Sequence, residues 1–266
     1  MKNFLITLFA FTALFGFISC EQDDTDDIEI DIRNINDRLS IAREEHERLL
    51  DSITVLISSL ENDADFNVNA LKMSQNNSLF FSIARQPEVA EDLISASESS
   101  YSNFTELLPF SDDVILERGI AMGSLFIGMA RQPSASDILN IAAAQFLGEF
   151  DEVPMSDDFF VNGRSRGLAL KDLFEGVARQ PEAFDTLVNT ATRFLGDYDA
   201  AIFDNETNTV VKEFAIDGLI EGIARNPEAI DQLNSISIQF LGFAFINDQG
   251  TFIDEDIATL AKRIQF

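Results

Sequence analysis

One short motif occurs four times in this chain, and its even spacing constrains the fold more than any other feature. The motif is an arginine followed by Gln-Pro or Asn-Pro, and its arginines follow one another at intervals of 46, 48 and 46 residues. These residues, called here the arginine row, are Arg85, Arg131, Arg179 and Arg225. A fixed period of about 20 to 50 residues is typical of stacked units that bury a face against their neighbours.

The third copy of the motif predicts a helical hairpin. Apolar residues between 170 and 177 fall one helical turn apart, which is the stripe of an amphipathic helix. Pro181 ends that helix, because the residue before a proline is disfavoured in the helical region. The same proline suits the first position of a second helix, with Gln180 as its cap. That helix carries a second apolar stripe and ends at Gly196, a residue that tolerates the left-handed conformation.

We therefore predict an all-α fold of four helical-hairpin repeats of about 46–48 residues, arranged as an α-solenoid or as a compact bundle. The period is similar to that of HEAT-like helical pairs. The predicted repeats lie at residues 71–104, 111–148, 164–196 and 208–242. They belong to a repeat domain of residues 63–266, which ends in a cap helix at 253–264.

A glycine stands three residues before the arginine in three of the repeats: Gly128, Gly176 and Gly222. Glycine inside a helix costs about 1 kcal/mol relative to alanine, so its recurrence needs a reason. Either neighbouring helices approach closely at this point, or the backbone contacts a ligand.

The chain begins as a secretory signal does. Lys2 is followed by an apolar run at residues 4–18, and Cys20, the only cysteine, comes directly after it. A basic start with an apolar run of this length is typical of a signal peptide rather than of a spanning helix. The segment resembles a bacterial lipoprotein signal, which implies a signal peptide at 1–19 and a lipid on Cys20. The alternative is an uncleaved apolar helix with a free thiol.

Acidic residues follow the cysteine immediately, so that residues 20–27 form an acidic tether. This tether resembles the export signal of surface-exposed lipoproteins of the Bacteroidota. The resemblance implies a protein held in the outer membrane by the lipid on Cys20 and facing the cell exterior. Attachment to the periplasmic face, with the acidic residues as a solvated spacer, is the alternative.

Residues 28–62 predict a long coiled-coil-like helix. Apolar positions there alternate at spacings of three and four without a slip. Leu50 and Ile57 widen the stripe, as in a helix that packs on a globular partner. Packing on the protein's own domain and assembly into a homo-oligomer both remain open. His46, the only histidine, lies on the seam, and we interpret it as a core residue rather than a ligand.

Composition excludes several classes of partner. The chain holds 46 acidic and 18 basic residues, a net charge of −28, which repels nucleic acid. Its 25 Phe, 2 Tyr and no Trp argue against a glycan-binding surface, since sugars stack on rings that carry a polar edge. We predict no cofactor. Calcium held by the acidic connectors is the alternative, although no segment has the EF-hand spacing.

No catalytic motif is found. The sequence has no His-Glu-x-x-His, no Gly-x-Ser-x-Gly, no phosphate-binding glycine loop and no cysteine pair. We assign no catalytic and no metal-binding residue and predict that the protein is not an enzyme. A carboxylate-based or metal-dependent hydrolase is the alternative.

The arginine row is the sharpest candidate site. It could bind an acidic peptide or a small ligand. Alternatively, each arginine could pair with a carboxylate of the neighbouring repeat or cap its own helix. Occurrence in every repeat favours the structural role. The sequence thus predicts a surface-anchored lipoprotein that works through other proteins, as an interaction or structural module or as an accessory subunit of an outer-membrane assembly. A module that captures a ligand through the arginine row is the alternative.

Overall fold

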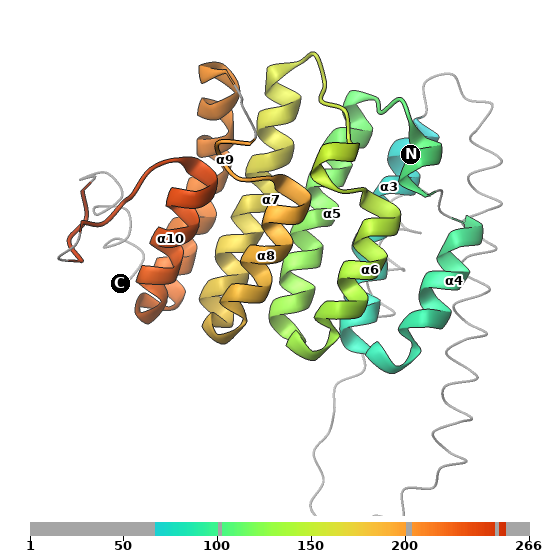
Figure 1. Ribbon diagram of the computed structural model, residues 1–266, viewed down its shortest axis with the longest axis horizontal. Helices are drawn as coiled ribbons and strands as arrows, with labels where there is room; N and C mark the ends of the chain where they lie inside the picture. Colours follow the sequence, from blue (N-terminus) through green and yellow to red (C-terminus); the bar gives the residue numbers. More distant parts are fainter. Residues whose placement is uncertain (1–66, 101–102, 201–203, 248–249, 254–266) are drawn as a thin grey trace, which may run out of the picture. The chain divides into compact units, whose positions relative to one another are not determined.

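The computed structural model of the chain describes residues 67–100, 103–200, 204–247 and 250–253, all within one compact unit (Figure 1). Several predictions fall outside these residues: the signal peptide with Cys20, the acidic tether, the 28–62 helix with His46, and the cap helix beyond Ile253. They stay predictions.

Eight α-helices lie within the described residues and form four hairpins, which confirms the predicted all-α fold. The hairpins are α3 (Val68–Arg85) with α4 (Ala90–Ser100), α5 (Asp112–Arg131) with α6 (Ser136–Leu147), α7 (Phe159–Arg179) with α8 (Phe184–Leu195), and α9 (Asn205–Arg225) with α10 (Ile230–Leu241).

Three of these helices begin earlier than the sequence predicted. α3 begins at Val68 rather than near residue 71, α7 at Phe159 rather than near 164, and α9 at Asn205 rather than near 208. Each start is set by an N-cap residue, Asn67, Asp158 or Asp204, whose side chain accepts a hydrogen bond from a backbone N–H of the first turn. Such N-caps satisfy donors that have no partner within the helix, so the helix extends back to them.

The hairpins stack in chain order as two layers of helices (Figure 1). The first helices, α3, α5, α7 and α9, pack side by side in one layer. Each second helix contacts the first helix of its own hairpin and that of the hairpin before it: α6 touches α5 and α3, α8 touches α7 and α5, and α10 touches α9 and α7. The Arg-Gln-Pro turns lie along one edge of the two layers, and the connectors between hairpins lie along the opposite edge.

The four hairpin turns share one conformation, which corrects a detail of the prediction. In the third turn, the backbone N–H of Gln180 bonds to the carbonyl of Gly176 and ends α7. Pro181 then opens a short 3₁₀ turn, Pro181–Ala183, before α8 begins. Gln180 caps this turn with its backbone carbonyl, which accepts from Ala183, and its side chain makes no capping bond. The backbone of Gln180 therefore caps the turn, and its side-chain amide takes no part.

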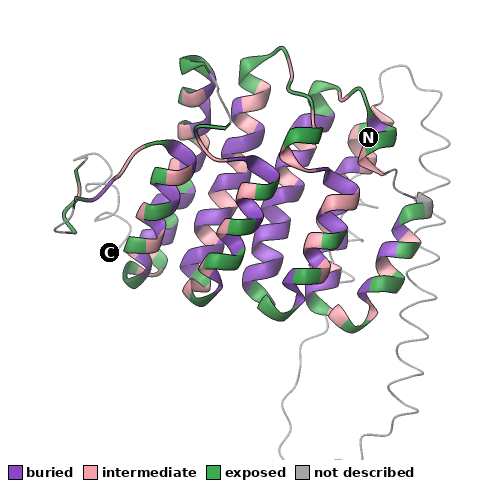
Figure 2. Ribbon diagram, viewed as in Figure 1, coloured by how far each residue is buried: buried purple, intermediate pink, exposed green. Residues whose placement is uncertain are grey.

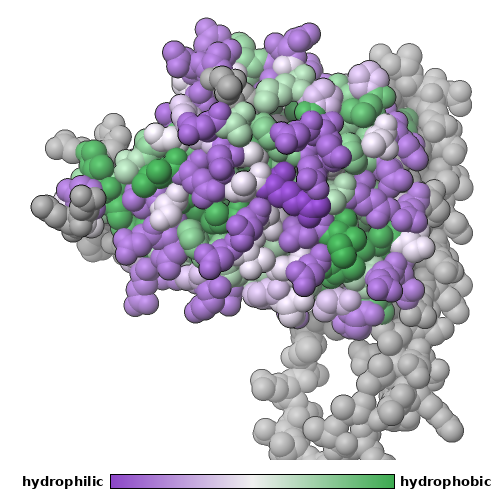
Figure 3. Space-filling view, viewed as in Figure 1, coloured by the Kyte–Doolittle hydropathy of each residue, from purple (hydrophilic) through white to green (hydrophobic). Residues whose placement is uncertain are grey.

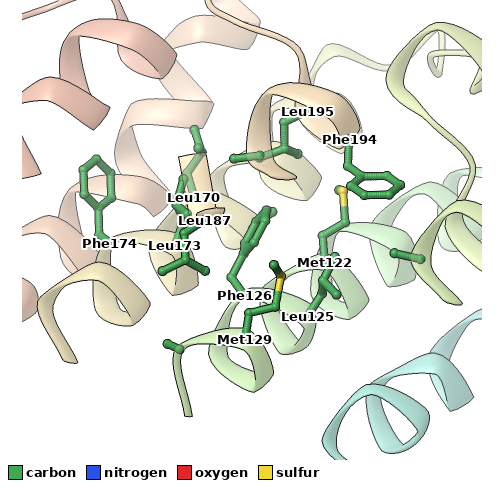
Figure 4. Close-up of a cluster of buried hydrophobic side chains, with 14 of the residues drawn as sticks. Met122, Leu125, Phe126, Met129, Leu170, Leu173, Phe174, Leu187, Phe194 and Leu195 are labelled. Atoms are coloured by element: carbon green, nitrogen blue, oxygen red, sulfur yellow. The ribbon is translucent and has the colours of Figure 1, made fainter. Parts of the chain in front are cut away.

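Buried residues run along the helices of both layers (Figure 2), and phenylalanine is prominent among them. The first layer contributes Phe80, Phe126 and Phe174 at equivalent positions, and the second contributes Phe146, Phe194 and Phe240. All six are fully buried. Figure 4 shows one such cluster, in which Phe126 and Met122 from α5 meet Leu187, Phe194 and Leu195 from α8. Because a buried Phe stabilises a core by about 3–5 kcal/mol over Ala, the repeated phenylalanines hold the stack together.

The recurring glycines mark close contacts between first-layer helices. A Cβ atom on Gly176 would lie 3.4 Å from the Cβ of Ala130 on α5, and one on Gly222 would lie 3.3 Å from the Cβ of Ala178 on α7. The contact is tighter at Gly218, where a Cβ would overlap the backbone of Lys171. First-layer helices therefore approach closely at these glycines, as one of the two explanations from the sequence expected, and the space at Gly176 is just large enough for the Cβ of an alanine.

Candidate functional site

The arginine row lies at the hairpin turns, at the exposed ends of the four first-layer helices. Two of its members share one carboxylate. Glu175 Oε1 accepts from Nε of Arg179, at 3.0 Å within α7, and from Nη2 of Arg225, at 3.2 Å across from α9. Arg131 instead stacks over the ring of Phe81 on α3, with 5.5 Å between the guanidinium carbon and the ring centroid.

These contacts join neighbouring helices of the first layer, α9 to α7 and α5 to α3. They favour the structural interpretation for Arg131, Arg179 and Arg225. Their energetic weight is small, however, because Arg225 is 43% exposed, and exposed ion pairs contribute about 0–1 kcal/mol.

A second row of basic residues lies deeper in the fold than the arginine row, and its role was not predicted from the sequence. A lysine or arginine stands 13 residues before each member of the arginine row. This inner basic row consists of Lys72, Arg118, Arg166 and Lys212. Its two arginines are almost fully buried, Arg118 at 7% and Arg166 at 5% exposure. The constant 13-residue offset is the signal that could have revealed it.

Arg118 ties the ends of two second-layer helices to α5. Its Nε–H donates to the carbonyl of Leu147 at 2.7 Å, and its Nη2 group donates to the carbonyls of Gly148 at 2.9 Å and Phe194 at 3.1 Å. The first two acceptors end α6 and the third lies in the last turn of α8. A cation suits this position, because the last carbonyls of a helix lack partners and carry its negative dipole end.

Arg166 makes the equivalent contacts one hairpin further on. It donates to the carbonyls of Leu195 and Gly196 at the end of α8 and reaches Phe240 in α10 at 3.5 Å. In the fourth hairpin Lys212 lies 5.2 Å from the centre of the Phe243 ring, just after α10. The repeated Phe-Leu-Gly sequence thus ends α6 and α8 where an arginine of the first layer reaches the carbonyls of the leucine and the glycine.

The glycine of that sequence has a specific conformation. Gly148 and Gly196 have φ of 68° and 66° with extended ψ, so they are not the left-handed helical caps that the sequence predicted. Gly242 alone of the three adopts that conformation, with φ 73° and ψ 17°. The extended ψ turns the chain out of the helix while the glycine carbonyl still meets the arginine.

Burial disfavours the charged form of both arginines. Burial lowers the pKa of Arg118 to about 10. Burial lowers the pKa of Arg166 to about 10 as well, although the carboxylate of Asp197 acts in the opposite direction. Both side chains remain cationic at neutral pH. Arg118 is therefore a core cation held by neutral carbonyls and helix ends rather than by an acidic partner.

A small open pocket of about 60 Å³ adjoins these two arginines. It lies between α5, α7, the end of α8 and the connector that follows α6. Arg118, Asn162, Ser165 and Arg166 contribute its polar wall. Its apolar wall includes Met122, Phe150, Val153, Met155, Phe194 and Leu195. In Figure 4 the side chain of Met122 points toward Phe194.

One carboxylate of the first layer has an unusual pKa. Asp172 lies against Gly123, in the contact between α7 and α5. Burial, and next the charge of Glu175, raise the pKa of Asp172 to about 6. The group thus titrates close to neutral pH.

The described part of the chain contains no cluster of three or more His, Cys, Asp or Glu side chains placed to bind a metal ion. None of the helices described is both long and apolar enough to cross a membrane. Comparison with family models, with curated proteins and with solved structures gave no match.

Proposed function

We propose that this protein is a surface-anchored lipoprotein that acts without catalysis, as a protein-interaction or structural module and as an accessory subunit of an outer-membrane assembly. The observation that carries the proposal is a regular acidic row on the outer layer of a tightly tied helical stack. Six residues after each member of the arginine row stands an exposed acid: Glu91, Asp137, Asp185 and Asp231.

Each of these acids lies in the first turn of a second-layer helix. A negative charge there stabilises its own helix by about 0.3–1 kcal/mol through the helix dipole. This local effect accounts for each acid separately, within its own helix. The regular spacing of the helices makes the four carboxylates a periodic row that a basic protein surface could match.

The same layer also exposes apolar side chains. Ile141 on α6 is 58% exposed and Ile238 on α10 is 51% exposed. Figure 3 shows that hydrophilic side chains cover most of this face and that apolar patches lie among them. Apolar anchors surrounded by polar residues are the usual anatomy of a protein interface. The proposed partner is therefore a protein with a basic, partly apolar surface.

The arginine row enters this proposal as a structural element. Arg179 and Arg225 already pair with Glu175, and Arg131 stacks on Phe81. Ligand capture through the arginine row would therefore require breaking contacts between helices. The membrane anchor rests on the sequence of residues 1–27 and is part of the proposal.

A pull-down tests the subunit role. The tagged protein is purified from gently solubilised membranes of its native cells, and co-purifying proteins are identified by mass spectrometry. We expect one large outer-membrane protein in fixed ratio. The triple variant Asp137→Lys, Asp185→Lys, Asp231→Lys should lose it. The control variant Glu206→Lys, Glu213→Lys, with charge reversals on exposed residues of α9, should retain it.

Purification of the protein alone would refute the subunit role, and equal retention of the partner by both variants would refute the acidic row as its interface. The anchor has its own test, since Cys20→Ser removes the atom to which the lipid would attach. The variant should move from the membrane fraction to the soluble fraction. Wild-type protein that is already soluble would contradict the anchor and leave the interaction role to the pull-down.

A further inference from the structure

The geometry points to a binding site for a small aliphatic monocarboxylate in the pocket beside Arg118, with the carboxylate on the Nη1 group of Arg118 and the short carbon chain against the apolar wall. This inference is independent of the proposed partner protein.

Arg118 has one hydrogen-bond donor group that the described residues do not use. Its Nε and Nη2 groups bond to helix carbonyls, whereas its Nη1 group donates no hydrogen bond to any residue in the described ranges. Nη1 is also not sealed in the core without a partner, so it retains contact with solvent. Arg118 is 7% exposed and lines the pocket, and we infer that its Nη1 group meets solvent there.

The other polar groups of the pocket are engaged. Asn162 exchanges two hydrogen bonds with the backbone of Ser156, at 2.9 and 2.7 Å. The hydroxyl of Ser165 donates to the carbonyl of Ile115 at 2.7 Å, and Arg166 holds the end of α8. Arg118 Nη1 is consequently the donor that a ligand would meet, and its charge selects an acceptor with a negative charge.

The size and lining of the pocket narrow the ligand further. A volume of about 60 Å³ exceeds the roughly 10–15 Å³ that one water needs and suits a ligand of about four to six heavy atoms. Met122, Phe150 and Val153 offer an apolar wall to a carbon chain. With a net charge of −28, the protein repels a phosphate dianion more strongly than a carboxylate monoanion. Together these features favour acids of the size of propionate and butyrate.

Two methionines at the pocket make a direct test practical. Protein labelled with ¹³C at the methionine methyl groups is titrated with sodium butyrate and observed by NMR. Met122 and Met155 line the pocket, while Met73 lies on α3 and Met129 lies two helical turns beyond Met122 on α5. We expect saturable shifts of the first two signals, with half-saturation in the millimolar range that is typical of a ligand this small.

The charge and the pocket are tested separately. Butyramide, a neutral analogue of butyrate, should bind about tenfold more weakly, because its neutral carbonyl accepts a hydrogen bond from Arg118 without the ion pair that a carboxylate makes. Val153→Glu places a competing carboxylate in the pocket and should weaken butyrate binding by at least about tenfold. The matched control Leu108→Glu adds the same charge at an exposed apolar connector residue outside the pocket and should bind as the wild type does.

Several results would overturn the inference. They are the absence of any shift up to about 100 mM butyrate, an equal response to butyramide or sodium chloride, and shifts that include Met73 and Met129 as strongly as the pocket methionines. Equal weakening in both glutamate variants would likewise show that general charge, and not this pocket, governs the effect. The readout does not depend on any partner protein, so the result leaves the proposed function to its own test.

Discussion

Replacing Arg118 by methionine should destabilise the protein more than any change in the arginine row. The substitution keeps an unbranched side chain of similar length but removes every donor. The carbonyls of Leu147, Gly148 and Phe194 then lose their hydrogen bonds to the guanidinium. Leaving a buried polar group unsatisfied costs about 1–3 kcal/mol.

The three unsatisfied carbonyls set an upper limit on the loss of stability. The actual loss is smaller, because the substitution also removes a buried charge. Burial already lowers the pKa of Arg118 to about 10, so the guanidinium itself is destabilised in the core, and methionine removes that penalty. We therefore expect a net loss of about 3–5 kcal/mol, the lower part of the range for three buried carbonyls left without a partner at about 1–3 kcal/mol each. Since domains are stable by about 5–15 kcal/mol, the variant should be marginal.

Urea unfolding followed by circular dichroism measures this loss, with the free energy compared across a matched series. Arg118→Lys keeps the charge but not the planar fork of donors, and should fall between methionine and wild type. Arg131→Met removes the cation that lies over the ring of Phe81, and should lower the free energy of unfolding by less than about 1 kcal/mol. If Arg118→Met and Arg131→Met lose the same small amount, the inner basic row does not hold the layers together.

Three further changes follow from the same contacts. Asp172→Asn should stabilise the protein at pH 7 by up to about 3 kcal/mol. Because the pKa of Asp172 in the folded protein is raised to about 6, the wild type gains stability as the pH falls from 7 toward 4. The stabilities of the wild type and the variant should therefore converge near pH 4, and a difference in stability that stays constant with pH would contradict this. Gly218→Ala should lower stability by about 1–3 kcal/mol despite the better helix propensity of alanine, since its Cβ meets the backbone of Lys171. An unchanged melting temperature would show that α7 and α9 can separate at little cost. Glu175→Gln should cost about 1 kcal/mol at low ionic strength and much less in 1 M salt; a loss that salt leaves unchanged would point to packing rather than to its ion pairs.

The hairpin is the part of this fold that the sequence by itself determined. Its signals are local: the apolar stripe, the proline that ends one helix and opens the next, and the Phe-Leu-Gly end all act within a few residues. The fixed period then implied stacking, and the recurring glycine offered helix approach as one of its two explanations. Local signals also existed for the starts of α7 and α9, because Asp158 and Asp204 are ordinary N-cap residues that the sequence analysis did not use.

The spacing of the inner basic row is visible in the sequence, but the burial and contacts of its arginines needed the tertiary structure. Arg118 contacts carbonyls 29, 30 and 76 residues further along the chain, and a lysine or arginine inside an amphipathic helix ordinarily faces solvent. Nothing in a single repeat indicates that its guanidinium turns inward to the ends of two helices. The small pocket beside it arises in the same way, from the packing of α5, α7, α8 and one connector. The sequence determined the repeating unit because helix signals are short-range. The stacking of those units decided which side chains were buried, which charges met, and where a ligand could enter, because those contacts join residues that are distant in the chain.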